Sequence, residues 1–171
     1  MEKALGEING LPAHVLLIHF VVIVVPLAAL CALLAVAWPA ARRRLGIVTP
    51  LIALAALVSV PLTTEAGEWL EERVAETPLS EAHVEIGESL LPWVIALFLL
   101  TAAHWAWFRY VAAPDGRFSQ AVAGRQSRRV ITLVLAAAIV AAAAGSVVTV
   151  VLIGESGVRA VWSGNVSSGE N

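Results

Sequence analysis

The sequence contains little charge and almost no cysteine. Asp, Glu, Lys and Arg make up 14% of its 171 residues, whereas a soluble domain has about 25%. Cys31 is the single cysteine, so the chain offers neither a disulfide framework nor a thiolate metal cluster. A nucleophile elbow, a phosphate loop and a paired serine and histidine signature are also missing. The motifs therefore give no support to an enzymatic function.

Long hydrophobic runs take the place of these features. Hydrophobic residues make up 59% of the chain, and a helix that crosses a bilayer needs about 20 of them in a row. The first run is too long for a cleavable signal peptide. We therefore predict an all-α fold, a four-helix transmembrane bundle that forms one integral membrane domain over 1–171. The predicted spans are 11–38, 45–66, 90–110 and 130–153.

Charge is distributed unevenly between the connections. Arginines cluster in 40–46 and in 111–129, which places both connections in the cytoplasm by the positive-inside rule. Eight of the thirteen acidic residues are glutamates between 65 and 88, so 67–89 is predicted to be an acidic outer loop. The N- and C-termini are then both extracytoplasmic. The chain is expected to be a multi-pass protein of the cell membrane.

Small residues suggest how the spans pack. Helices in lipid approach one another through small side chains, and Ala137, Ala141 and Gly145 follow a four-residue spacing that predicts a contact face on the fourth span. The lipid bilayer is the expected partner. Basic loops attract anionic headgroups, and nothing indicates nucleic acid. The sequence leaves open whether the chain forms a homo-oligomer or joins a larger membrane complex.

Polar residues of all four spans converge at the outer face. Imidazole and carboxylate groups together suit zinc, iron or manganese, and helix bundles build such sites from facing side chains. Glu65 and Glu68 are three residues apart, which places them on neighbouring parts of one helix face. A solvated acidic loop is the alternative interpretation of the glutamates. The candidate ligands of a divalent metal ion are His14, Glu65, Glu68, His83 and Glu88.

The histidines also suggest a b-type haem held from two spans. His14 and His83 are expected at similar depth, which makes them the better pair. His19 is a further candidate, but it lies about 7.5 Å below His14 along the helix and on another side of it. It is expected to pair with another helix. His104 is near the inner end of its span, too far in depth from His19 for one iron.

The opening segment GLPAHVLLIHF (10–20) resembles the start of a bacterial membrane family catalogued as domain of unknown function 2231. The segments at 61–74, 81–88 and 154–162 resemble a high-GC subgroup, and arginine-rich, lysine-poor usage fits a high-GC bacterium. The resemblance implies a four-helix integral membrane protein. It places His14, His19, Glu65, Glu68 and His83 within motif positions, and it implies no activity.

Two functions from different classes follow. The leading hypothesis is a non-enzymatic membrane protein that binds a metal ion or haem at its outer face and serves electron transfer or metal handling. The alternative is a structural or assembly subunit of a larger membrane complex, without a cofactor. A transporter needs ionisable groups near the bilayer midplane. Only His19 comes close to that depth, so this third class ranks last.

Overall fold

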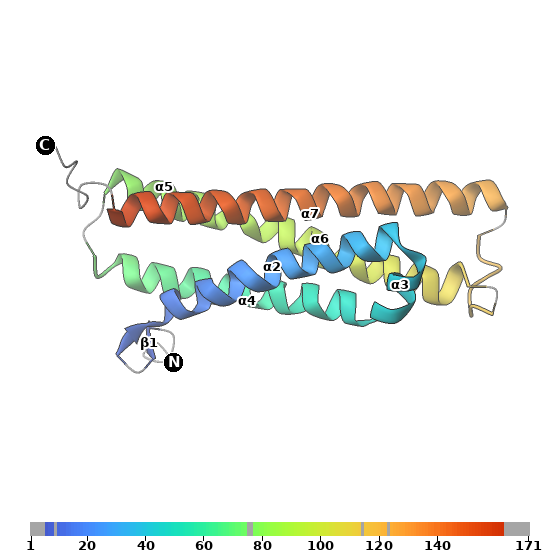
Figure 1. Cartoon of the computed structure of the whole chain (residues 1–171), viewed down its shortest axis with the longest axis horizontal. Helices are drawn as coiled ribbons and strands as arrows, with labels where there is room; N and C mark the ends of the chain where they lie inside the picture. Colours follow the sequence, from blue (N-terminus) through green and yellow to red (C-terminus); the bar gives the residue numbers. More distant parts are fainter. Residues whose placement is uncertain (1–5, 9, 75–76, 114, 123, 163–171) are drawn as a thin grey trace, which may run out of the picture.

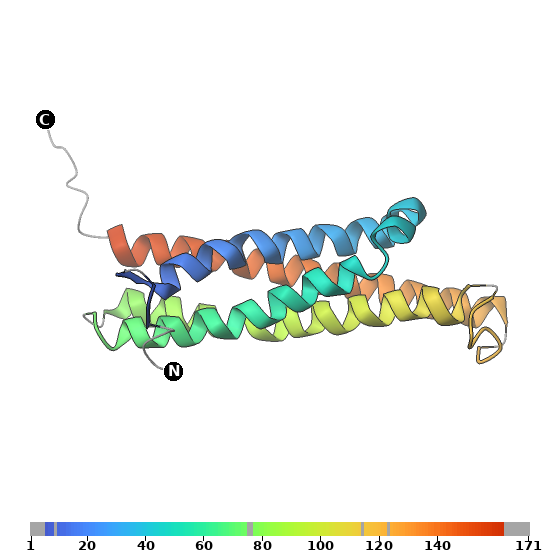
Figure 2. The same ribbon diagram turned by 90° about the horizontal axis from the view of Figure 1, so that it is seen from below.

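Four long helices form an antiparallel bundle in the computed structural model, which describes residues 6–8, 10–74, 77–113, 115–122 and 124–162. Each helix packs against two neighbours in the cyclic order α2, α4, α6, α7 (Figures 1 and 2). The predicted all-α four-helix class is confirmed. The long helices are α2 (Ala13–Ala37), α4 (Val48–Glu71), α6 (Leu90–Ala106) and α7 (Arg125–Trp162).

Short elements close the two ends of the bundle. The strands β1 (Glu7–Ile8) and β2 (Leu11–Pro12) pair antiparallel just before α2. Helix α3 (Pro39–Leu45) follows α2, α5 (Pro78–Glu88) precedes α6, and the π-helical turn η1 (Trp107–Val111) continues α6.

The two ends of the bundle differ in chemistry. We call one the histidine end, which comprises the start of α2, the end of α4, α5 and the end of α7 (Figure 1). The opposite end, with α3, η1 and the start of α7, is the arginine end.

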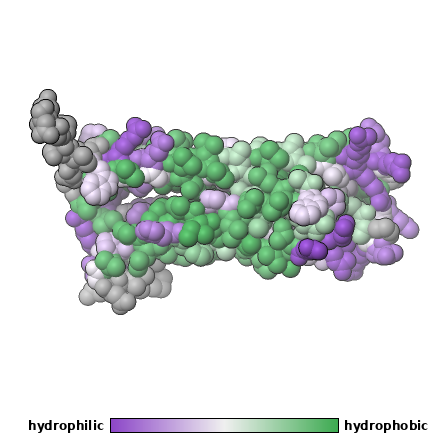
Figure 3. Space-filling view, in the orientation of Figure 1, coloured by the Kyte–Doolittle hydropathy of each residue, from purple (hydrophilic) through white to green (hydrophobic). Residues whose placement is uncertain are grey.

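A hydrophobic band separates these ends. Figure 3 shows hydrophilic residues gathered at both ends of the visible face and hydrophobic residues between them. Four helices are long and apolar enough to cross a membrane, when α5, α6 and η1 are taken as one. Many large apolar side chains on the helices are exposed, such as Ile23, Leu99 and Val134, as lipid contact requires. These features support a multi-pass membrane protein.

The connection predicted at 40–46 is largely helical. A proline disfavours helical backbone angles in the residue before it, and Trp38, which precedes Pro39, is extended at φ −127° and ψ 108°. The chain therefore changes direction there. Pro39 then starts α3, since the first helical turn needs no proline N–H.

The segment predicted as a loop at 67–89 also differs from expectation. Helix α4 continues to Glu71, and α5 begins at Pro78. Thr77 caps α5, because its hydroxyl accepts from the Ser80 N–H at 3.1 Å and the Ser80 hydroxyl accepts from the Thr77 N–H at 2.9 Å. The prediction took the glutamates as a sign of a loop, although glutamate is a good helix former.

The contact face of α7 is not the one predicted. Ala137 and Ala141 are exposed, and the residues of α7 that face the core are Ile139, Ala142, Ala143, Ser146, Thr149, Val150 and Ile153. Gly145 does make a close approach, since a Cβ atom added there would lie 2.3 Å from the ring of Trp93.

This approach predicts the effect of Gly145→Ala. The added methyl group collides with the Trp93 ring, and overpacking of this kind costs about 1–3 kcal/mol. Thermal unfolding in detergent should show a lower melting temperature for Gly145→Ala. Gly154→Ala is the control on the same helix, because a Cβ there has no neighbouring atom within 4 Å. Equal melting temperatures for the two variants would contradict the packing.

Candidate functional site

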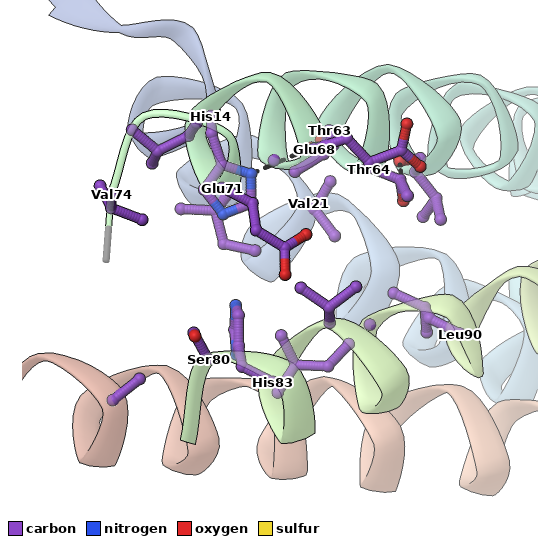
Figure 4. Close-up of a pocket in the computed structure, with 18 residues that line it drawn as sticks. His14, Val21, Thr63, Thr64, Glu68, Glu71, Val74, Ser80, His83 and Leu90 are labelled. Atoms are coloured by element: carbon purple, nitrogen blue, oxygen red, sulfur yellow. Dashed lines mark hydrogen bonds between the residues drawn. The ribbon is translucent and has the colours of Figure 1, made fainter. Parts of the chain in front are cut away.

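A cavity of about 180 Å³ opens between the helices at the histidine end. His14 on α2 and His83 on α5 point toward one another across it, and Glu71 reaches into the same space from α4 (Figure 4). Both histidines are half-buried. Apolar side chains make up most of the remaining wall, among them Ile18, Val21, Val60, Val84, Leu90 and Ile153.

Helix α4 fixes the ring of His14. Its Nδ1 lies 3.0 Å from the Thr63 carbonyl oxygen, which only accepts, so Nδ1 carries the proton and donates. In the neutral ring Nε2 then keeps a free lone pair. Gly67 permits this position, because a Cβ there would lie 3.0 Å from Nδ1.

Helix α7 fixes the ring of His83 in a similar way. Its Nδ1 lies 2.9 Å from the hydroxyl oxygen of Ser156. When that hydroxyl donates its proton to the Ile153 carbonyl at 3.0 Å, His83 Nδ1 is the donor to Ser156. Its Nε2 also keeps a free lone pair. Gly157 leaves room for the ring, since a Cβ there would lie 3.1 Å from Cε1.

The spacing of the two rings fits one shared ion. Their centroids are 6.4 Å apart and their planes are 87° apart. With metal–nitrogen bonds of about 2.0–2.1 Å and the half-width of each ring added, two imidazoles on opposite sides of one ion have centroids about 6–6.5 Å apart. Histidine ligands also typically donate their other N–H to a carbonyl or similar group, as His14 does to Thr63.

The five predicted metal ligands do not converge. Glu65, Glu68 and Glu88 are exposed, and of these only Glu68 lines the cavity. Within the described ranges, no three His, Cys, Asp or Glu side chains are placed to hold one ion. Glu65 turns outward because its neighbour Ala66 and the nearby Thr63 occupy the buried face of α4.

The other candidate histidines lie away from the cavity. His19 is exposed on α2, and its Nδ1 donates to the Val15 carbonyl of the same helix at 2.5 Å. Among the described residues, His19 therefore does not have the expected partner on another helix. His104 is buried at the arginine end, with its ring centroid 4.9 Å from that of Phe108.

Four residues at the site were not predicted from the sequence: Thr63, Gly67, Ser156 and Gly157. A glycine inside a helix costs about 1 kcal/mol relative to alanine and usually has a packing reason. Gly67 and Gly157 carry that signal, since each lies in the last turns of a long helix. Nothing in the spacing identifies Thr63 or Ser156 as hydrogen-bond partners.

Comparison of the chain with protein-family models, curated proteins and solved structures finds no match. Function is therefore inferred from the cavity. An imidazole that holds its proton on Nδ1 has a lone pair on Nε2, so the rings of His14 and His83 can coordinate a metal from opposite sides. The mainly apolar wall limits the access of water to such a centre.

Proposed function

We propose that this membrane protein holds one metal centre between Nε2 of His14 and Nε2 of His83, and that the centre serves electron transfer or metal handling. The 6.4 Å separation of the two rings is the observation that carries the proposal. The hydrogen bonds of both Nδ1 atoms support it, because each leaves Nε2 free for the metal.

Two forms of the centre share these ligands. A b-type haem iron needs only two protein ligands, and the apolar wall suits a porphyrin. A divalent metal ion fits the cavity of about 180 Å³ without rearrangement, but it needs further ligands from water, because no third carboxylate or imidazole among the described residues is placed to bind it. A porphyrin is larger than this cavity, so the arrangement of the helices favours the ion over the haem.

The orientation of the helix bundle in the membrane is part of the same proposal. Arginines gather at one end of the bundle and glutamates at the other, which supports a cytoplasmic arginine end and an extracytoplasmic histidine end. The segment 10–20 supports membership of the family catalogued as domain of unknown function 2231, in a high-GC bacterium. The centre then lies at the outer face of the cell membrane.

The second candidate function is a subunit that assembles with other membrane proteins. Ala137 and Ala141 favour it, because both are exposed on α7 and small residues let another helix approach closely. This function requires no cofactor.

An optical spectrum, reduced minus oxidised, together with elemental analysis tests the proposal on protein purified in detergent. Wild type should show either a haem band or a stoichiometric metal. His14→Ala should lose it, because one of the two ligands is gone. His19→Ala is the matched control on the same helix, since His19 is exposed and bonds only to Val15 in the described structure. Colourless, metal-free wild-type protein would leave the assembly subunit as the function.

A further inference from the structure

A second cavity, of about 500 Å³, lies at the arginine end. Three arginines line it: Arg42 and Arg43 from α3, and Arg109 from η1. Thr49 from the first turn of α4 and Thr101 and His104 from α6 also line it. Elements far apart in the sequence thus bring positive charge to one half-open cavity, in which Arg42 is half-buried and Arg43 and Arg109 are exposed.

No carboxylate balances this charge. In the described part of the chain, none of the three arginines lies within 4.0 Å of an acidic side chain. The Arg42 guanidinium instead lies over the Phe108 ring, 3.6 Å from its centroid. Burial, and then the nearby charge of Arg43, lower the pKa of Arg42. Arginine nevertheless stays protonated in proteins, so the cavity is cationic.

Thr49 provides an independent sign of a ligand. Its side chain is 4% exposed, and its Oγ1 has no hydrogen-bond partner among the described residues. Buried hydroxyl groups are nearly always hydrogen-bonded, and an unsatisfied one in a native structure calls for an explanation. Thr49 lines the same cavity as the arginines. Its hydroxyl is closed off from the cavity in the observed rotamer, and a rotation about the Cα–Cβ bond lets it donate to an anion bound there.

We propose that this cavity binds a phosphate group. Guanidinium groups match phosphate oxygens with paired hydrogen bonds, and Thr49 adds a neutral donor. The phosphate belongs either to the headgroup of an anionic phospholipid or to a soluble phosphate compound. Basic pockets at the cytoplasmic side of transmembrane helices favour lipid headgroups. Trp105 lines the cavity as well, and tryptophan prefers the headgroup level.

Two binding measurements separate the sources. Calorimetry in detergent measures the affinity for inorganic phosphate. Electron spin resonance in phosphatidylcholine nanodiscs measures the preference for spin-labelled phosphatidylglycerol over spin-labelled phosphatidylcholine. The variants are Arg42→Gln, Arg109→Gln and Thr49→Val. Arg159→Gln removes the same charge at the histidine end, where Arg159 is exposed and, among the described residues, forms an ion pair only with Glu155, at 3.7 Å.

A lipid source predicts a wild-type preference for phosphatidylglycerol that falls about tenfold in Arg42→Gln and Arg109→Gln. Thr49→Val should reduce it by about fivefold without lowering the melting temperature, because valine removes a buried hydroxyl that only the ligand satisfies. Arg159→Gln should change it less than twofold. If the ligand is instead a soluble phosphate compound, the affinity for inorganic phosphate should show this pattern across the variants, and the preference for phosphatidylglycerol should be absent. The proposal fails if wild type binds neither probe, or if Arg159→Gln weakens binding as much as Arg42→Gln.

Discussion

Replacing His83 with alanine is expected to remove the metal centre completely. The variant keeps His14 and its hydrogen bond to the Thr63 carbonyl, but one imidazole alone gives an ion only one protein ligand. Loss of a group that merely orients a ligand costs about 10–100-fold in metal affinity, so loss of the ligand itself should cost more. Elemental analysis and the reduced-minus-oxidised spectrum measure the loss.

Free imidazole separates a ligand from a packing residue. His83→Ala leaves a space beside Gly157, and imidazole added to the buffer should enter it and restore the metal or the haem band. A residue that only stabilises the fold would show no such recovery of the centre. The matched control is Glu85→Ala, which lies on α5 but is exposed and does not line the cavity. If imidazole does not restore the metal or the haem band in His83→Ala, and this variant keeps the wild-type melting temperature, the result would argue against coordination by His83.

The four helices were predictable because the bilayer dictates their length and composition. Runs of about 20 apolar residues have few alternatives to a spanning helix. The faces of those helices were not predictable in the same way. In lipid, exposed and buried positions are both apolar, so the polar stripe that marks the surface of a soluble helix is absent. For this reason Ala137 and Ala141 were assigned to the contact face of the fourth span, although both are exposed.

The site was predictable only in part. His14 and His83 were identified because histidine is unusual at the end of an apolar span, and the structure places their rings 6.4 Å apart. The expected carboxylate ligands Glu65 and Glu68 depended on a shared helix face that points into the bundle. Both lie on α4 as expected, but that face is exposed. The partners Thr63 and Ser156 depend on helix packing, which no spacing along the chain reveals.

Helix packing also explains why glycine recurs beside the histidines. Gly67 and Gly157 lie on different helices, and each leaves the room that one imidazole ring occupies. A histidine on α2 or α5 can then approach the backbone of α4 or α7 closely enough for its Nδ1 to reach Thr63 or Ser156. Ring position and tautomer are thus set together.

Gly67→Val should therefore lower the affinity for the metal or haem by at least about tenfold. Tenfold is the lower end of the range of affinity losses that follow removal of a hydrogen bond to a metal ligand. A Cβ at position 67 lies 3.0 Å from His14 Nδ1, and the two further methyl groups of valine push the ring away from the Thr63 carbonyl. Gly67→Ala should have a smaller effect, because the ring needs to move by only a few tenths of an ångström. Metal titration of both variants measures the difference.

The control for this substitution is Gly154→Val on α7. It makes the same change of residue within a helix, but a Cβ there meets no atom within 4 Å. Its metal affinity should equal that of wild type. If Gly67→Val bound the centre as tightly as Gly154→Val does, His14 would not need its hydrogen bond to Thr63. The approach of α2 to α4 would then be a matter of helix packing alone.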